Sequence, residues 1–130
     1  MSTVLDQIIS HLEFLGYEIE QREGGIIKAN HQLHANFLFH LFGFGFMAKA
    51  MYGVNTLGKS HRSDFLERLN AYNGLARVSR AYVDKDFDLA VEAVFPNYYD
   101  KAAFGTFMES YNDDMGALGY GDLKLSEYLN

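Results

Sequence analysis

The chain has 130 residues, of which 48% are hydrophobic and 22% charged, as in an average globular domain. Its formal net charge of −6 disfavours non-specific binding to nucleic acid, because that mode of binding needs clustered lysine and arginine. The chain has no cysteine, which excludes disulfides and thiolate metal sites and fits a reducing cytosol. We therefore expect a single domain over residues 1–130.

The start of the sequence and its longest apolar run both argue against a membrane segment. Met1–Val4 has neither the basic residues nor the following apolar stretch of a secretory signal peptide. Phe37–Met47 is about half of the ~20 residues that span a bilayer, and it contains His40. We predict a cytoplasmic protein without a membrane partner, and we interpret Phe37–Met47 as buried strand.

The first 30 residues predict a helix followed by a hairpin. Apolar side chains recur at three- and four-residue spacing over Leu5–Leu15, so we expect a helix that is capped by Ser2. Tyr17–Glu23 has the two-residue period of a half-buried strand. Gly24–Gly25 predicts a tight turn, after which residues 26–30 return as the second strand.

The segment 36–52 is apolar on both faces of a strand. Its alternating positions form two mostly apolar sets: Phe37, Phe39 and Leu41 on one side, and Leu38, His40 and Phe42 on the other. Such a pattern is typical of a central strand that is covered on both faces. Gly43 and Gly45 indicate a bulge, a bend or a turn, so the pattern leaves open one long bent strand or a hairpin.

The same apolar segment has two functional interpretations. Burial statistics favour a core role for its aromatic and methionine side chains. Met and Phe are also adaptable contact residues, so one sheet face could pack against helices while the other meets a partner or a second copy. The interface residues expected under the second interpretation are Phe42, Phe44, Phe46, Met47 and Met51.

The remaining sequence predicts a helix, a second hairpin and a last helix. After a loop, a helix begins at Ser63 or Asp64 and continues to about Tyr72. Segments 75–83 and 87–95 read as strands joined by an acidic turn.

The last predicted helix is capped by Asp100 and continues to about Leu118. The predicted order is α-β-β-β-(β)-α-β-β-α. Short connections require antiparallel pairing, because parallel pairing needs a long crossover. We predict an α+β fold with an antiparallel twisted sheet flanked by helices.

The segment Gly53–Ser60 matches the phosphate-loop pattern G-x-x-x-x-G-K-[ST]. Backbone N–H groups beside Gly53 and Gly58 would cradle phosphates, Lys59 would reach the terminal phosphates and Ser60 would contact magnesium. The context disfavours this function, because a phosphate loop belongs to a parallel sheet and these strands read as hairpins. The alternative interpretation is a flexible glycine-containing loop.

The other candidate chemistry is weak. His31, His34 and His40 form a loose cluster with no helical spacing, so we expect ordinary hydrogen-bonded histidines and no metal site. No serine has an assignable base and no nucleophile motif is present. We predict no catalytic residues and no cofactor. Asn70 and Asn73 share a helix face, and we expect a structural role for them.

Three segments resemble the YbjN-like domain of bacteria: Leu69–Asn73, Arg80–Asp84 and Asp88–Glu92. In that family a helix carrying an L-N-x-x-N element precedes a strand hairpin with an acidic turn and a final helix. The resemblance extends over about Leu5–Leu118. It implies a fold similar to that of type III secretion chaperones, which are usually dimeric and bind extended effector segments. The family is described as regulators of sensory transduction without an agreed biochemical activity.

Three hypotheses of function follow from these observations. The leading one is a non-enzymatic protein-interaction domain, chaperone-like or regulatory, that forms a homodimer and binds neither nucleic acid nor membrane. The second is a nucleotide- or phosphate-binding protein that uses Gly53–Ser60. The third is a sensor of a small ligand with an aromatic pocket.

Overall fold

The computed structural model describes residues 3–130, apart from the side chain of residue 120. Six strands form one sheet: β1 (Glu18–Gln21), β2 (Ile27–Asn30), β3 (Phe37–Phe42), β4 (Gly45–Tyr52), β5 (Ser79–Val83) and β6 (Leu89–Pro96). The α-helices are α1 (Val4–Phe14), α2 (Thr56–Ser60), α3 (Arg62–Leu75) and α4 (Lys101–Tyr120). Two short 3-10 helices, η1 (Glu23–Gly25) and η2 (Leu125–Tyr128), complete the described elements.

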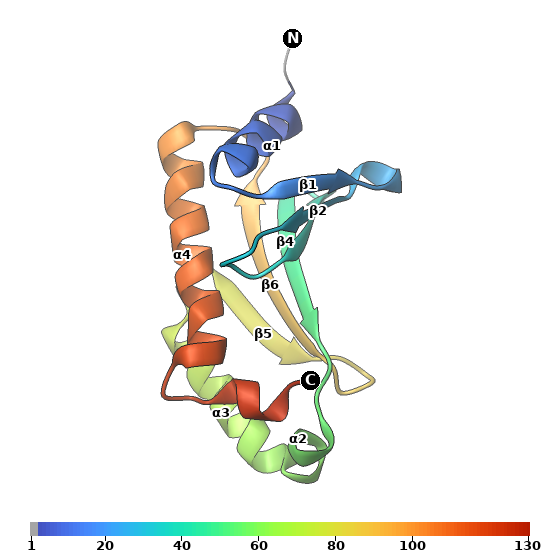
Figure 1. Ribbon diagram of the computed structural model, residues 1–130, viewed down its shortest axis with the longest axis vertical. Coiled ribbons are helices and arrows are strands. Elements are labelled where there is room, and N and C mark those ends of the chain that lie inside the picture. The colour runs from blue at the N-terminus through green and yellow to red at the C-terminus, as the bar shows by residue number, and fades with distance from the viewer. Residues whose placement is uncertain (1–2) are drawn as a thin grey trace.

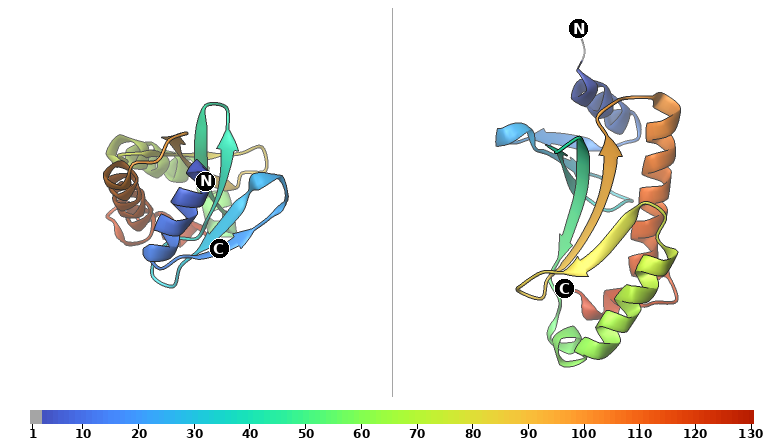
Figure 2. Two further views of the ribbon diagram at one scale, coloured as in Figure 1. Left: turned by 90° about the horizontal axis from the view of Figure 1, so that it is seen from above. Right: turned by 180° about the vertical axis from the view of Figure 1, so that it is seen from behind.

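The sheet has the strand order β1-β2-β3-β4-β6-β5, and every neighbouring pair is antiparallel (Figure 1). The predicted α+β class and its antiparallel sheet are therefore confirmed. Helices α1, α3 and α4 lie on one side of the sheet, and in the part of the chain that the structure describes no helix covers the other side (Figure 2). We call the helix-covered side the inner face and the other the outer face.

The segment that the sequence left undecided is a hairpin. Strands β3 and β4 pair along their length, and Phe42 faces Gly45 across a two-residue turn. Gly43, the first turn residue, has a φ of +53°, a conformation that side chains other than glycine rarely adopt. This turn carries Phe44 beyond the end of the sheet.

Helices α1 and α4 begin with side-chain caps, whereas α3 has none. Thr3 caps α1 by accepting the N–H of Asp6 at 3.0 Å, and the Asp6 carboxylate accepts the N–H of Thr3 in return. The predicted cap Ser2 lies outside the described residues. Asp100 caps α4 as predicted, through a 2.8 Å bond from the N–H of Ala103.

Several predicted boundaries between residues 53 and 79 were wrong. Part of the expected loop Gly53–Ser60 is the short helix α2, and α3 begins at Arg62 and ends at Leu75, so β5 starts only at Ser79. Asn55 starts α2 by accepting the N–H of Gly58 at 2.8 Å. Glycine and threonine are weak helix formers, so the sequence of α2 carries little helical signal.

The core lies between the inner face and helices α1, α3 and α4, and it is rich in aromatic rings. Phe39 stacks on Phe46 at 5.1 Å between ring centroids, and Phe95 contacts Phe104 of α4 at 5.3 Å. Tyr111, on α4, is fully buried and contacts the ring of Phe37. Burial of such side chains is the main stabilising contribution to a domain of this size.

The edge strand β5 is closed by two polar side chains. Asn73 on α3 donates to the carbonyl of Ala81 at 2.9 Å and accepts its N–H at 2.8 Å. The buried Asp114 carboxylate on α4 accepts the N–H groups of residues 77, 78 and 79. The structural role predicted for Asn73 is confirmed, whereas Asn70 is exposed. This edge has few free backbone groups with which a further strand could pair.

In the described residues, no helix combines the length and apolarity that a membrane crossing requires.

Candidate functional site

The outer face of the sheet is left uncovered by helices α1, α3 and α4 (Figure 2). Its side chains come from alternating positions of β2, β3, β4, β6 and β5, and they mix apolar with charged residues. They include Lys28, Leu38, His40, Phe42, Met47, Lys49, Met51, Arg80, Tyr82, Glu92 and Val94. An antiparallel sheet that is covered on one face ordinarily has a polar outer face. The apolar side chains on this outer face are therefore candidates for contact with a partner.

A buried carboxylate, Glu92, lies on the outer face in β6, next to the edge strand β5. Glu92 accepts a hydrogen bond from Arg80 at 2.9 Å and one from the Tyr82 hydroxyl at 3.1 Å, and Lys49 Nζ lies 3.6 Å away. Burial alone would raise the pKa of Glu92. The two hydrogen bonds and the charges of Lys49 and Arg80 outweigh burial, so its pKa lies below the ordinary value. Glu92 is therefore charged near neutral pH, with its charge compensated within the face.

The hairpin tip is the most exposed apolar part of this region. The exposed fraction is 82% for Phe44 and 41% for Phe42, and Leu41 beside them is also exposed. Val94 and Tyr98, on the neighbouring strand end and the chain after it, are exposed as well. We define the hairpin tip as these five residues.

The other predicted interface residues have different positions. Met51 is exposed on the outer face, at the end of β4 away from the hairpin tip. Met47 is on the outer face but is shielded by its neighbours, with an exposed fraction of 8%. Phe46 points to the inner face and stacks on Phe39 in the core. The structure thus leaves Phe42, Phe44 and Met51 accessible to a partner.

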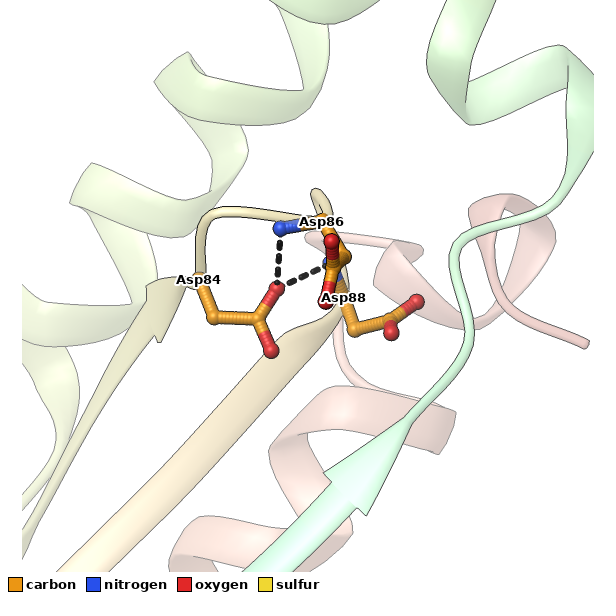
Figure 3. A group of neighbouring side chains, drawn as sticks. All are labelled: Asp84, Asp86 and Asp88. Atoms are coloured by element: carbon orange, nitrogen blue, oxygen red, sulfur yellow. Dashed lines mark hydrogen bonds between the residues drawn. The ribbon is translucent and has the colours of Figure 1, made fainter.

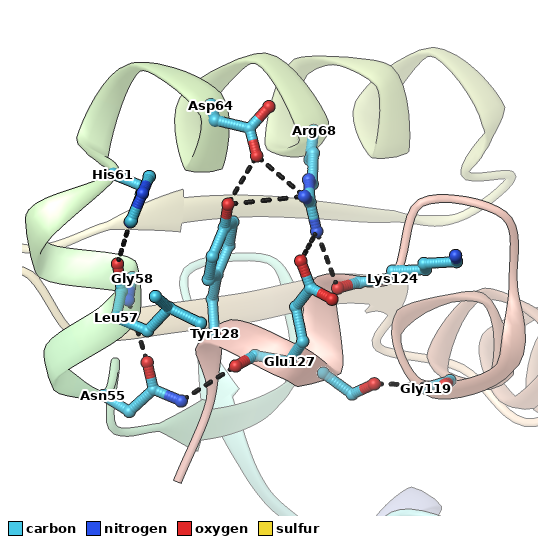
Figure 4. A network of polar contacts seen from close by, with 11 residues as sticks. Asn55, Leu57, Gly58, His61, Asp64, Arg68, Gly119, Lys124, Glu127 and Tyr128 are labelled. Atoms are coloured by element: carbon cyan, nitrogen blue, oxygen red, sulfur yellow. Dashed lines mark hydrogen bonds and ion pairs between the residues drawn. The ribbon is translucent and has the colours of Figure 1, made fainter.

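Residues 128–130 lie against the segment Gly53–Ser60, and η2 lies beside α2 (Figure 4). The Gly53 carbonyl accepts the N–H of Asn130, and Asn55 donates its N–H to the carbonyl of Tyr128. Gly58 lies inside α2, where a Cβ atom would come within 2.6 Å of the Val54 side chain and 3.0 Å of Tyr128. The close approach of Val54 and of η2 therefore explains this glycine.

The geometry of this segment gives no support to phosphate binding. The N–H of Gly58 is bonded to the Asn55 side chain, and that of Lys59 to the Asn55 carbonyl. Lys59 and Ser60 are exposed, and the Ser60 hydroxyl donates to the carbonyl of Leu57. The sheet is antiparallel, whereas a phosphate loop connects a parallel strand to a helix.

An ion-pair network fixes η2 against α3 (Figure 4). The Tyr128 hydroxyl donates to Asp64 at 2.5 Å, and Arg68 lies between Asp64 at 2.8 Å and Glu127 at 2.7 Å. The hydrogen bond from Tyr128 and the charge of Arg68 hold the pKa of Asp64 below its ordinary value. The network is structural, because each of its charged groups has an intramolecular partner.

Three carboxylates meet at the turn between β5 and β6 (Figure 3). Asp84 accepts the backbone N–H groups of Asp86 at 2.9 Å and Asp88 at 3.0 Å, which is the usual way in which aspartate stabilises a turn.

His31 also has a structural role, in the connection between β2 and β3. One of its ring nitrogens accepts N–H groups from residues 33 and 34, and the other bonds the carbonyl of Leu15.

A shallow cavity lies between α1 and the connection that leads into α4. It is lined by Asp6, Gln7, Ser10, His11, Phe14, Tyr99 and Lys101. The His11 ring is hydrogen-bonded to the Tyr99 hydroxyl at 2.8 Å, and burial, assisted by the charge of Lys101, lowers the pKa of His11. Only Phe14 and Tyr99 supply carbon rings, so this cavity is less aromatic than the predicted sensor pocket.

Sequence reasoning missed the charged residues of the outer face. The alternation of β4 and β6 put Lys49 and Glu92 on one side of each strand, but the register that makes them neighbours depends on the fold. For Lys28 the sequence pattern predicts only a place in the second strand of a hairpin. The available signal was a single charged residue in each of β2, β4 and β6, whose other residues are mostly apolar.

No protein-family model matches the sequence, and no curated protein matches it closely enough to count as a relative. Solved structures do match. The crystal structure of YbjN, a proposed transcription regulator from E. coli, has a TM-score of 0.74 and 15% identity, over 99% of each chain. A structure of the heterodimeric ExoU–SpcU complex from the type III secretion system of Pseudomonas aeruginosa matches with a TM-score of 0.59 and 13% identity, covering 88% of this chain and 94% of that one. The YbjN-like, secretion-chaperone-like fold implied by the sequence is confirmed.

Proposed function

We propose that this chain is a non-enzymatic, cytoplasmic protein-interaction domain, chaperone-like or regulatory, that works as a homodimer. The observation that carries the proposal is the exposed hairpin tip, where Phe44 has an exposed fraction of 82%. Contiguous exposed apolar side chains on a globular protein mark interaction sites, and aromatic residues are enriched in the centres of interfaces.

The hairpin tip is held in place before any partner arrives. The carbonyl of Phe44 accepts the N–H of Asn97, which ties the turn to the chain after β6. Gly45 lies so close to the carbonyl of Phe95 that a Cβ atom would be 2.6 Å from its oxygen. A fixed surface loses little conformational entropy on binding, so its apolar contacts contribute more fully to affinity.

The charge distribution favours a second copy as the partner of the tip. Residues 41–45 contain no charged side chain, although the whole chain has a net charge of −6. Two copies can therefore bring their tips together around a two-fold axis without like charges at the contact. In such an isologous interface the same patch is used by both subunits.

The solved structures of similar fold support a role in protein association. One of them is a chain of a heterodimeric complex and another is a proposed regulator. In neither case does the similarity in sequence exceed 15%, so the support concerns the kind of function and not a shared partner.

The mass of the protein in solution tests the proposal. We expect light scattering after gel filtration, at about 100 µM, to give twice the chain mass of 14.8 kDa. Phe44→Asp should give the single-chain mass with an unchanged melting temperature, because Phe44 lies outside the core and a buried aspartate at the contact is unfavourable. A monomeric wild type, or a dimeric Phe44→Asp, would overturn self-association through the tip.

Leu33→Asp is the matched control. Leu33 is as exposed as Phe44, with a fraction of 87%, but it lies in the β2–β3 connection at the opposite end of β3. We expect this variant to keep the wild-type mass, which separates loss of the tip contact from the general effect of one more negative charge.

A further inference from the structure

A second feature of the outer face is a groove beside the β1–β2 hairpin. Its lining includes Arg22, Lys28, Asn36, Leu38, Lys49 and Met51, and also the sheet residues 37 and 50. Three cations thus line the groove, and no carboxylate does. This is unusual for a chain in which acidic residues outnumber basic ones by 17 to 11.

The strand register places the cations at a defined spacing. Lys28 on β2 faces Leu38 on β3, and Leu38 faces Lys49 on β4. Neighbouring strands are about 4.8 Å apart, so the backbones at Lys28 and Lys49 are about 10 Å apart with the Leu38 side chain between them. Across the groove, a positive side chain (Lys28), an apolar one (Leu38) and a second positive one (Lys49) therefore follow one another.

The positive charge of the groove is only partly compensated. Lys49 lies 3.6 Å from Glu92, but that carboxylate already accepts hydrogen bonds from Arg80 and Tyr82. Arg22 contacts Glu20 at 4.0 Å, in a pair whose side chains are both about half exposed and which is therefore weak. Glu20 on β1 faces Lys28 across the β1–β2 pair, but among residues 3–130 no carboxylate lies within ion-pair distance of Lys28.

We propose that this groove binds an acidic segment of a partner protein, in which two carboxylates flank an apolar side chain on one face. The proposal rests on the function proposed above and adds the chemistry of the partner. The carboxylates pair with Lys28 and Lys49, and the apolar side chain packs on Leu38 and Met51. Positions i, i+3 and i+7 of a helix cover about 10 Å, and positions i, i+2 and i+4 of a strand cover about 13 Å.

A protein segment fits the groove better than a nucleic acid does. Leu38 and Met51 offer an apolar floor that a phosphate backbone cannot use, and the net charge of −6 repels a long polyanion. A short acidic segment meets only the local positive charge. It also gains from burial of its apolar side chain, which salt does not screen.

The test is a selection of random 12-residue peptides by the full-length protein. We expect the enriched peptides to carry at least two Asp or Glu residues with an apolar residue between them, at one of the two spacings above. Binding of a fluorescein-labelled enriched peptide should weaken several-fold between 50 and 500 mM NaCl, because the charges are near the surface.

Two variants that make the same charge change, one inside and one outside the groove, test whether the peptide binds in the groove. Lys28→Glu should weaken the labelled peptide about tenfold or more, and Lys28→Gln by a smaller factor, with unchanged melting temperatures. Lys59→Glu makes the same charge change at an exposed lysine on α2, outside the groove, and should leave the affinity within twofold.

Three outcomes would overturn the proposal: enriched peptides that are not acidic, equal effects of Lys28→Glu and Lys59→Glu, or displacement of the peptide by a single-stranded oligonucleotide at similar concentration. Its failure is distinguishable from that of the proposed function, because the dimer measurement with Phe44→Asp involves no groove residue. If the protein is a dimer but selects no acidic peptide, only the proposal for the groove is overturned. If the protein is a monomer that selects acidic peptides, only the proposed homodimer is overturned.

Discussion

At the scale of single residues, the Tyr111 hydroxyl is the buried side-chain polar atom that has no hydrogen-bond partner in the described chain. Burial raises the pKa of Tyr111, so the hydroxyl stays neutral and its unmet hydrogen bond is a cost to the fold. We expect Tyr111→Phe to raise the free energy of unfolding by about 1 kcal/mol, because it removes the desolvated hydroxyl and keeps the ring. Urea unfolding at neutral pH measures the change.

Tyr17→Phe is the control for that prediction. The Tyr17 ring is also buried, but its hydroxyl donates to Asn112 at 3.2 Å. Its removal should lower the free energy of unfolding by about 1 kcal/mol, since Asn112 loses a donor. If Tyr111→Phe proved as destabilising as Tyr17→Phe, the Tyr111 hydroxyl would have to be bonded to an internal water.

At the scale of elements, η2 is an integral part of the core. It packs against α2, α3 and α4, and its Leu125 side chain is fully buried. We expect Leu125→Ala to lower the free energy of unfolding by about 3 kcal/mol, through lost burial and the cavity that remains. Leu33→Ala, at an exposed leucine, should change it by less than about 0.5 kcal/mol. Equal effects of the two in urea unfolding would show that η2 does not stabilise the domain.

The elements that the sequence predicted well are those whose signal is local. The alternation over residues 87–95 identified β6, because one face of that strand packs on α4. The apolar stripe and Asp100 cap identified α4. By contrast, the alternation over residues 36–52 could not separate a bent strand from a hairpin, because both faces are apolar there.

The elements that the sequence missed depend on contacts distant along the chain. Helix η2 has a single turn, too short for a periodic pattern, and it is held by Asp64 and Arg68, about 60 residues earlier. In α2, Gly58 lies against Val54 and Tyr128, so this glycine of the phosphate-loop pattern is accounted for by packing. The groove on the outer face requires the pairing of β2, β3 and β4, and no pattern within one strand contains that register.

At the scale of the whole molecule, we expect three separate sites to lower the stability in acid: His11 between α1 and the connection into α4, Asp64 between α3 and η2, and Glu92 on the outer face. All three have a pKa below their ordinary values of 6.5, 3.8 and 4.5. When the folded pKa is the lower one, the unfolded chain takes up the proton first. Each site therefore loses its contribution as pH falls through the ordinary value towards the folded one.

We expect the midpoint of urea unfolding to fall in two steps between pH 8 and pH 3. The first step begins near pH 6.5 and comes from His11, whose burial disfavours the imidazolium. The second begins near pH 4.5 and comes from Glu92 and Asp64, which lose their hydrogen bonds from Arg80, Tyr82 and Tyr128 when protonated.

His11→Asn separates the two steps, because asparagine keeps a polar group near the Tyr99 hydroxyl but does not titrate. This variant should lose the step near pH 6.5 and keep the one near pH 4.5, whereas Glu92→Gln should reduce only the second. A first step that persisted in His11→Asn would assign it to another group. Such a result would mean that the part-buried contact between His11 and Tyr99 does not make the fold sensitive to mild acid.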